Sequence, residues 1–191
     1  HKSGTSPRHS CLAAAGVGPG DEVISPGLTV IMDALVTLHQ NAIPVFADID
    51  PETFNIDITK VKSAITKRTK AVIPVHLFGQ SADMKPLLAF CRERGIDVIE
   101  DACQAHGALY HSRKAGTMGD TGCFSFYPTK NLGAWGDAGA IVTDKETIYK
   151  KLLMMRDCGR KSGSRYEHHI LGYNSRLDTL QAAVLLVKLA Y

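Results

Sequence analysis

Short apolar runs alternate with stretches of helical periodicity along the middle of this chain of 191 residues. The candidate strands are Glu22–Ser25, Pro44–Ala47, Ala71–His76, Asp97–Glu100, Gly122–Phe126 and Ala138–Thr143. Such alternation is typical of βαβ units, in which a crossover helix brings each strand parallel to the previous one. The sequence therefore predicts an α/β fold with three α/β/α layers and a mostly parallel sheet.

Helices are expected between and beyond these runs. One follows Asp57, which is placed to cap it, and a second runs from Met84 to Cys91 and stops at Gly95. Further helices are predicted at Cys11–Ala15, Lys145–Arg156 and Asp178–Tyr191. The last of these has Asp178 at the N-cap, Gln181 at the capping-box position and an apolar face through Ala182, Leu185, Leu186 and Leu189.

Composition and charge narrow the class of protein. The 45% hydrophobic content is ordinary for a globular domain, and 22 basic against 19 acidic residues give a net charge of +3. This near balance, spread along the chain, argues against a nucleic-acid partner. The five cysteines form an odd set without paired metal-type spacing, so we expect reduced thiols in a cytoplasmic protein and no metal. No apolar run approaches the length that spans a bilayer.

Residues with polar or ionisable side chains follow several of the predicted strands. In an open parallel sheet, ligands lie outside the carboxyl ends of the strands. That rule places His76, Asp101, Gln104 and the Ser125–Lys130 segment at one cleft. Glu100 points away from Asp101 if the strand continues through both, so the two are not expected to act as a catalytic pair.

Lys130 and Asp101 together suggest a site for pyridoxal 5'-phosphate (PLP). A lysine amine can form a Schiff base with the cofactor aldehyde, and a carboxylate can pair with its protonated pyridine nitrogen. Each residue has a plainer interpretation. Lys130 alone could be a solvated surface charge, and Asp101 alone could cap the following helix.

Several stretches, in this order, resemble the sugar aminotransferases of the DegT/DnrJ/EryC1/StrS family, which are fold-type I PLP enzymes related to aspartate aminotransferase. They are Ser3–Ser6, Gly16–Ile24, Pro74–Gly79, Ile99–Gln104, Phe124–Asn131 and Gly172–Arg176. The resemblance covers nearly the whole chain. It implies that residues 1–191 are the PLP-binding large domain of a longer protein, without its N-terminal segment and its C-terminal small domain.

The resemblance also implies roles for individual residues. It makes Lys130 the Schiff-base lysine and Asp101 the partner of the pyridine nitrogen. It places Thr5, Ser6 and Ser125 at the cofactor phosphate, Gln104 beside the ring, and Asn174 at the phosphate of the neighbouring subunit's cofactor. A homodimer follows from this last role. Thr5 and Ser6 could instead do no more than cap a helix, because caps use the same residues.

Two features depart from the family pattern. Family members commonly have an aromatic residue that stacks on the cofactor ring after the segment matching Pro26–Thr29, but here Val30 follows. A valine offers apolar contact without an extended π face, so looser packing of the cofactor is expected. Family enzymes are also about twice as long, as two-domain chains are, so the isolated 191 residues are expected to bind PLP weakly and to catalyse nothing.

The resemblance implies an aminotransferase that moves an amino group from an amino acid, glutamate by resemblance, to a nucleotide-linked keto-sugar. One alternative is a PLP-dependent sugar dehydratase of the same family, which the resemblance associates with loss of the lysine that is present here as Lys130. Another is a catalytically silent binding or regulatory module with the same fold, which Val30 and the short chain suggest. Neither the sugar nor its nucleotide is encoded in these motifs.

Overall fold

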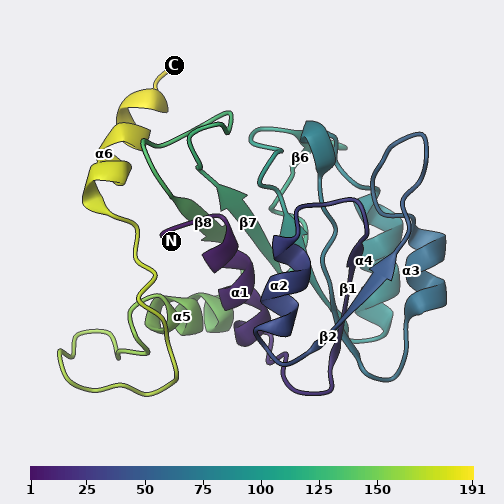
Figure 1. Ribbon diagram of the computed structural model, residues 1–191, viewed down its shortest axis with the longest axis horizontal. Helices are drawn as coiled ribbons and strands as arrows, with labels where there is room; N and C mark the ends of the chain where they lie inside the picture. The colour runs from purple at the N-terminus through teal and green to yellow at the C-terminus, as the bar shows by residue number, and fades with distance from the viewer.

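The computed structural model describes residues 1–191 and contains one six-stranded sheet in the order β2-β1-β3-β4-β7-β8 (Figure 1). Its strands are β1 Glu22–Pro26, β2 Ile43–Ala47, β3 Thr69–Val72, β4 Asp97–Asp101, β7 Thr121–Ser125 and β8 Gly139–Val142. All neighbouring pairs are parallel except β7 and β8, which are antiparallel. The predicted mostly parallel sheet is confirmed.

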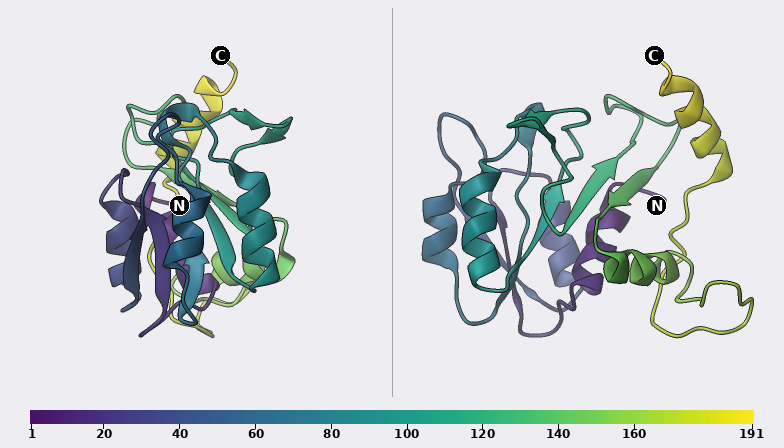
Figure 2. Two further views of the ribbon diagram at one scale, coloured as in Figure 1. Left: turned by 90° about the vertical axis from the view of Figure 1, so that its right-hand side faces the viewer. Right: turned by 180° about the vertical axis from the view of Figure 1, so that it is seen from behind.

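Helices cover both faces of this sheet. They are α1 Thr5–Ala14, α2 Met32–Leu38, α3 Ile58–Ala64, α4 Met84–Glu93, α5 Glu146–Met155 and α6 Thr179–Lys188. The left view of Figure 2 shows α2 and α4 on opposite sides of the strands. A 3-10 helix, Leu77–Gly79, follows β3, and a hairpin of β5 Leu109–Tyr110 and β6 Arg113–Lys114 stands apart from the main sheet.

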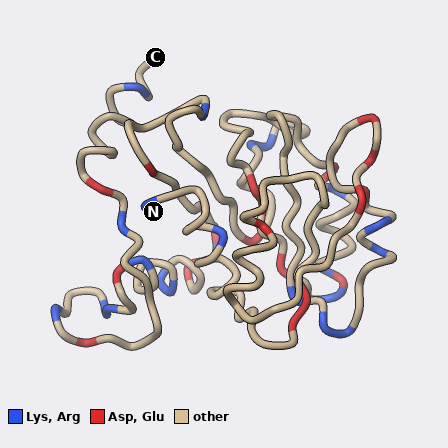
Figure 3. Tube along the Cα trace, in the orientation of Figure 1, with Lys and Arg blue, Asp and Glu red and all other residues tan.

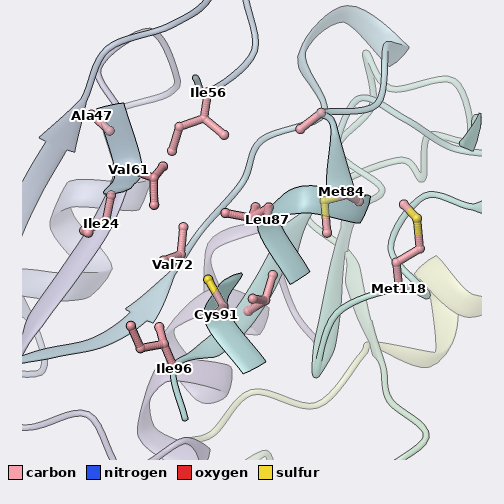
Figure 4. Close-up of a cluster of buried hydrophobic side chains, with 12 residues drawn as sticks. Ile24, Ala47, Ile56, Val61, Val72, Met84, Leu87, Cys91, Ile96 and Met118 are labelled. Carbon is pink, nitrogen blue, oxygen red and sulfur yellow. The ribbon is translucent and has the colours of Figure 1, made fainter. Parts of the chain in front are cut away.

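Two apolar clusters join these layers, one on each face of the sheet. Ile24 and Val72 pack against α3 and α4 in the cluster drawn in Figure 4. Their strand neighbours Val23 and Ala71 pack against α1 and α2 on the other face. Because successive side chains of a strand point to opposite faces, strands covered on both sides are apolar at consecutive positions. The predicted three-layer α/β/α arrangement is therefore confirmed.

The expected capping residues act as predicted at two helices. The Asp57 carboxylate accepts the Thr59 N–H (2.7 Å), and the Asp178 carboxylate accepts the Leu180 N–H (2.9 Å). Each satisfies one of the free N–H groups of a first helical turn. Just after α4, Gly95 has a φ of 63°, a left-handed conformation that glycine adopts at low cost.

The expected details of the last helix are partly wrong. No capping box forms, because the Gln181 side-chain oxygen accepts the backbone N–H of Trp135 (2.9 Å) instead of that of Asp178. Leu185 is buried beside Ala134 and Ala138. Leu186 and Leu189 are 72% and 68% exposed, so half of the predicted apolar face of α6 is not covered by this chain. Helix α6 accordingly stands at the edge of the molecule (Figure 1).

Three other elements differ from expectation. The predicted strand Ala71–His76 is shorter, since β3 ends at Val72 and Pro74, which lacks an N–H, follows soon after. The predicted helix Cys11–Ala15 is only the end of α1, which begins at Thr5. Helix α2 was not predicted, because neither its first residue nor its N-cap Ile31 carries a capping signal.

Charged residues of both signs are interspersed along the trace (Figure 3). All five cysteines are free thiols, as expected, and four of them are buried. No helix combines the length and the apolar character needed to cross a membrane. No group of three or more His, Cys, Asp or Glu side chains is arranged to hold a metal ion.

Candidate functional site

A cavity of about 330 Å³ opens at the carboxyl ends of β4 and β7, beside the beginning of α1. Its volume lies within the usual range for small-molecule sites, about 300–1,000 Å³. Among its lining residues are five that the sequence singled out, Thr5, Asp101, Gln104, Ser125 and Lys130. The parallel sheet brings the last four of them together because β4 and β7 are neighbours that end at the same edge, and Thr5 joins them from the beginning of α1.

The beginning of α1 lies directly against the end of β7. A Cβ atom placed on Gly4 would stand 2.6 Å from both Cβ and Oγ of Ser125, so only glycine permits this approach. Gly4 is also the N-cap residue of α1 and offers no side chain to the free N–H groups of the first turn. Apart from the N–H of Ser6, which is bonded to Ser3 Oγ, those N–H groups form a place where an anion is favoured, together with the Thr5 side chain and the Ser125 hydroxyl.

Ser6 lies outside the cavity lining. Its hydroxyl is 2.9 Å from the hydroxyl of Ser3, and its backbone N–H donates to the same Ser3 oxygen (3.1 Å). The alternative in which Thr5 and Ser6 serve as helix caps is not what the structure shows, since the hydroxyl that accepts a first-turn N–H of α1 is that of Ser3. Thr5 remains the residue of this pair that faces the cavity.

Lys130 reaches the cavity from the turn that follows β7. Its backbone N–H donates to the carbonyl of Tyr127 (2.8 Å), which closes this turn. The lysine is half-buried. Gln104 comes from the turn after β4, where its side-chain oxygen accepts the N–H of Phe78 (2.8 Å) and so fixes the amide at the rim.

Asp101 is the last residue of β4 and is almost fully buried. Its Oδ1 accepts the N–H of Cys103 (3.0 Å), and its Oδ2 accepts a hydrogen bond from Nη1 of Arg8. The same Nη1 donates to Asp33 Oδ1 (2.8 Å). Arg8 and Asp101 both line the cavity, and Asp33 lies behind them with no exposed surface.

Arg8 and Asp33 were not predicted as site residues, although the sequence around Arg8 indicates that its side chain is buried. It stands three and four residues before Cys11 and Leu12, which are buried on the face of α1 that meets the sheet. A charged residue on the apolar stripe of a helix is a buried polar group that needs partners. Asp33 gave no comparable signal, because α2 itself was not predicted.

Burial and charge shift the pKa values of this group. Burial, followed by the neighbouring Asp101 charge, raises the pKa of Asp33 to about 6 in spite of Arg8. Burial alone would lower the pKa of Arg8, but the carboxylates of Asp101 and Asp33 more than offset it, so that pKa is raised. Arg8 is therefore always a cation here. Burial also raises the pKa of the Cys103 thiol, which keeps it protonated and unreactive.

His76 does not share the cavity, contrary to the expectation that it would face the same cleft. It is fully buried, with Nε2 2.8 Å from Glu100 Oε2 and with Nδ1 accepting the N–H of Ala82 (3.1 Å). His76 is therefore a buried, hydrogen-bonded histidine outside the cavity. Glu100 points away from Asp101, as predicted, because the two are consecutive residues of β4.

Two further residues complete the predicted set. Asn174 is exposed in the segment between α5 and α6 and does not line the cavity. Its expected role at a neighbouring subunit's cofactor stays a prediction. Val30 does line the cavity, at the position where the family pattern has an aromatic residue, and it is 50% exposed.

The residues present fit PLP. One cavity is bordered by all three groups that the cofactor requires. They are a lysine for the aldehyde, a carboxylate for the pyridine nitrogen and an anion site for the phosphate. The contact between Gly4 and Ser125 brings the helix terminus to that anion site, and a side chain on Gly4 would fill it. This chain therefore supplies the lysine, the carboxylate and the anion site at one cavity.

Solved structures similar to this chain carry the same architecture. DesV from S. venezuelae is 44% identical with a TM-score of 0.94, and the match covers 99% of this chain and 50% of DesV. NtdA from Bacillus subtilis, with the bound cofactor PMP, is 39% identical with a TM-score of 0.91, over 97% of this chain and 42% of NtdA. The fold and the site thus define the class of PLP-dependent aminotransferases.

The model of the DegT/DnrJ/EryC1/StrS aminotransferase family matches residues 1–191, and this chain belongs to that family. A pleiotropic regulatory protein of Geobacillus stearothermophilus is 50% identical over 97% of this chain and 50% of its own length. A UDP-N-acetyl-3-dehydro-alpha-D-glucosamine 3-aminotransferase of Acidithiobacillus ferrooxidans is 48% identical over 96% of this chain and 49% of its own. The chain spans about half the length of these curated relatives.

Proposed function

We propose that the protein is a PLP-dependent aminotransferase that moves an amino group from an amino acid, glutamate by family resemblance, to a nucleotide-linked keto-sugar. The observation that carries this proposal is the presence of Lys130 and Asp101 on the walls of one cavity, with the anion site of α1 beside them. The similar protein of Acidithiobacillus ferrooxidans, whose name specifies a UDP-linked sugar, supports the substrate class.

Each of the residues at the cavity has a separate role in this proposed reaction. Bound PLP would supply an electron sink for bond cleavage at the donor α-carbon. Lys130 would anchor the aldehyde, and its amine, when free and neutral, would carry a proton to and from the donor α-carbon. Asp101 holds the proton on the pyridine nitrogen. Thr5, Ser125 and the first turn of α1 bind the phosphate and fix the ring between the other two groups.

The proposal includes the domain role of this chain, the oligomeric state of the protein and its compartment. Residues 1–191 serve as its cofactor-binding large domain, and the active form is a homodimer in which Asn174 reaches the partner's site. The exposed position of Asn174, away from its own cavity, supports that assignment. The free cysteines favour a reducing compartment, and hence the cytoplasm.

A second candidate function rests on a specific similarity. The relative that is 50% identical is named as a pleiotropic regulatory protein. A regulatory protein with this fold could bind PLP without transferring an amino group. The two functions differ in one requirement, because only the enzyme depends on the Lys130 amine for turnover.

The test is carried out on the full-length protein that contains this chain. Purified protein is mixed with PLP, its visible spectrum is recorded, and the complex is reduced with borohydride and mapped by peptide mass. We expect the pyridoxyl adduct on Lys130. With an amino acid and a nucleotide-linked keto-sugar, Lys130→Ala should reduce amino-group transfer by at least ~10³-fold, as loss of a covalent catalytic group does.

Matched variants separate chemistry from folding. Lys130→Arg keeps the positive charge but cannot form the adduct, so it should be as inactive as Lys130→Ala. Lys114→Ala, at an exposed lysine of β6, should leave both adduct and transfer unchanged. An adduct on Lys130 with no transfer to any keto-sugar tested would favour the regulatory function. Unimpaired transfer in Lys130→Ala would overturn the enzymatic assignment.

A further inference from the structure

Arg8, Asp33 and Asp101 form a buried ionic cluster at the inner wall of the cavity. Nη1 of Arg8 donates to a carboxylate oxygen of each aspartate, at 2.8 Å for Asp33 Oδ1. The three side chains are 4%, 0% and 3% exposed. Removing charges from water is costly, and a buried ion pair often stabilises a fold no better than apolar residues of similar size. Stability alone therefore does not explain the cluster.

The cluster carries one uncompensated negative charge. Two carboxylates face a single guanidinium, and no other charged group is bonded to them. The remaining contacts are neutral, from the Thr29 hydroxyl to Asp33 Oδ2 (2.6 Å) and from the Cys103 N–H to Asp101 Oδ1 (3.0 Å). A protonated pyridine nitrogen beside Asp101 would supply the missing positive charge.

Asp33 is essential to this balance. If Arg8 faced Asp101 alone, the pair would be neutral, and the guanidinium would disfavour a second cation on the same carboxylate. The negative charge of Asp33, on the far side of Arg8, offsets the guanidinium. Asp101 can still accept further hydrogen bonds, because a carboxylate has about four acceptor positions and Arg8 and Cys103 occupy two of them.

We propose that Arg8 and Asp33 are positioning residues for the cofactor site. Arg8 fixes the orientation of the Asp101 carboxylate, and Asp33 offsets the charge of Arg8 so that Asp101 keeps the pyridine nitrogen protonated. This inference rests on the proposed function, in which Asp101 meets that nitrogen. Neither residue touches the reacting atoms, and both act through Asp101.

The variant Asp33→Asn tests the charge balance. It keeps the shape of the side chain but leaves Arg8 paired with Asp101 alone. With PLP labelled with ¹⁵N in the ring, the nitrogen chemical shift of the bound cofactor should move toward the unprotonated value. We expect the pKa of the bound nitrogen to drop by about one unit, a tenfold change in its protonation equilibrium.

The double variant Arg8→Met/Asp33→Asn separates charge from general damage. It removes the cation as well, so Asp101 regains its single negative charge and the ¹⁵N shift should return to the wild-type position. The dissociation constant for PLP should stay about tenfold higher than in the wild type, because Asp101 has lost the partner that orients it. Generic disruption of the core predicts the opposite order, with the double variant worse than the single one in both measurements.

A distant buried carboxylate provides the control. Glu22 pairs with Arg68 at the start of β1, the opposite end of the sheet from Asp101, so Glu22→Gln should lower stability without moving the ¹⁵N shift. If Asp33→Asn does not fold, the double variant carries the test by itself. Loss of its protonated ¹⁵N signal, or unchanged affinity for PLP, would overturn the inference.

Failure of the proposed function remains distinguishable from failure of this inference. If the wild type gives no borohydride-trapped adduct on Lys130, the proposed function and this inference are both refuted. With that adduct and a protonated ring nitrogen in the wild type, an unchanged ¹⁵N shift in Asp33→Asn refutes only the role of Asp33 and Arg8.

Discussion

Asp101 and Glu100, two adjacent carboxylates of β4, have different roles because consecutive side chains of a strand point to opposite faces of the sheet. Asp101 accepts a hydrogen bond from Arg8 at the cavity, whereas Glu100 is fully buried on the other face of the sheet. Glu100 accepts the backbone N–H groups of Gly116 (2.7 Å) and Met118 (2.6 Å) and also that of Gly119. It thereby fixes the segment that leads into β7, the strand before Lys130.

Replacing Glu100 should therefore weaken the fold more than the chemistry. Glu100→Gln keeps the volume but puts an amide against backbone N–H donors, and we expect the free energy of unfolding at neutral pH to decrease by about 2–4 kcal/mol. Chemical denaturation measures this change. Glu93→Gln, an exposed carboxylate beside Arg94, is the control and should change stability by less than ~0.5 kcal/mol.

The effect of Glu100 should also depend on pH. Burial raises its pKa, but the hydrogen bonds from His76 and from the N–H groups of Gly119 and Gly116 outweigh it, so the pKa lies below its ordinary value of 4.5. A lowered carboxyl pKa contributes stability above the ordinary value, and this contribution is lost as the pH decreases through the lowered pKa. The difference between wild type and Glu100→Gln should shrink below pH 4.5. A constant difference would contradict this account.

At the scale of elements, the site depends on how closely α1 approaches β7. Gly4→Ala would place a methyl group 2.6 Å from Cβ and Oγ of Ser125, and the helix terminus would have to move outward. We expect the dissociation constant for PLP to rise on the order of tenfold to a hundredfold, since small displacements of a binding group are costly. Fluorescence titration with PLP measures it. Gly18→Ala is the matched control, because no atom lies within 4 Å of its added Cβ.

The same elements show how far sequence reasoning extends. Strands apolar at consecutive positions and helices with a capping aspartate, such as Asp57 and Asp178, were predicted because their signals are local. Helix α2 lacks such a signal, and the closeness of Gly4 to Ser125 involves residues distant in sequence. Of the cavity residues, Asp101 and Lys130 were identified from strand ends and family motifs. Arg8 and Asp33 become a pair only when α1 and α2 pack side by side.

At the scale of the whole molecule, the position of Asn174 makes dimerisation testable. In the proposed homodimer each site combines Lys130 of one subunit with Asn174 of the other. Lys130→Ala and Asn174→Asp should each be inactive as homodimers, the second because its carboxylate repels the cofactor phosphate. When the two variants are unfolded together and refolded, about half of the dimers should be mixed. Each mixed dimer contains one site with both native residues.

About a quarter of the wild-type transfer activity per subunit should therefore return on mixing, since one site in two is native in about half of the dimers. Refolding each variant separately and then combining them without exchange is the control and should return nothing. If Asn174 served the cavity of its own chain, every site in a mixed dimer would lack one residue, and mixing would restore no activity. The two arrangements of the same surface residue thus predict opposite results in one transfer assay with a single accepted keto-sugar.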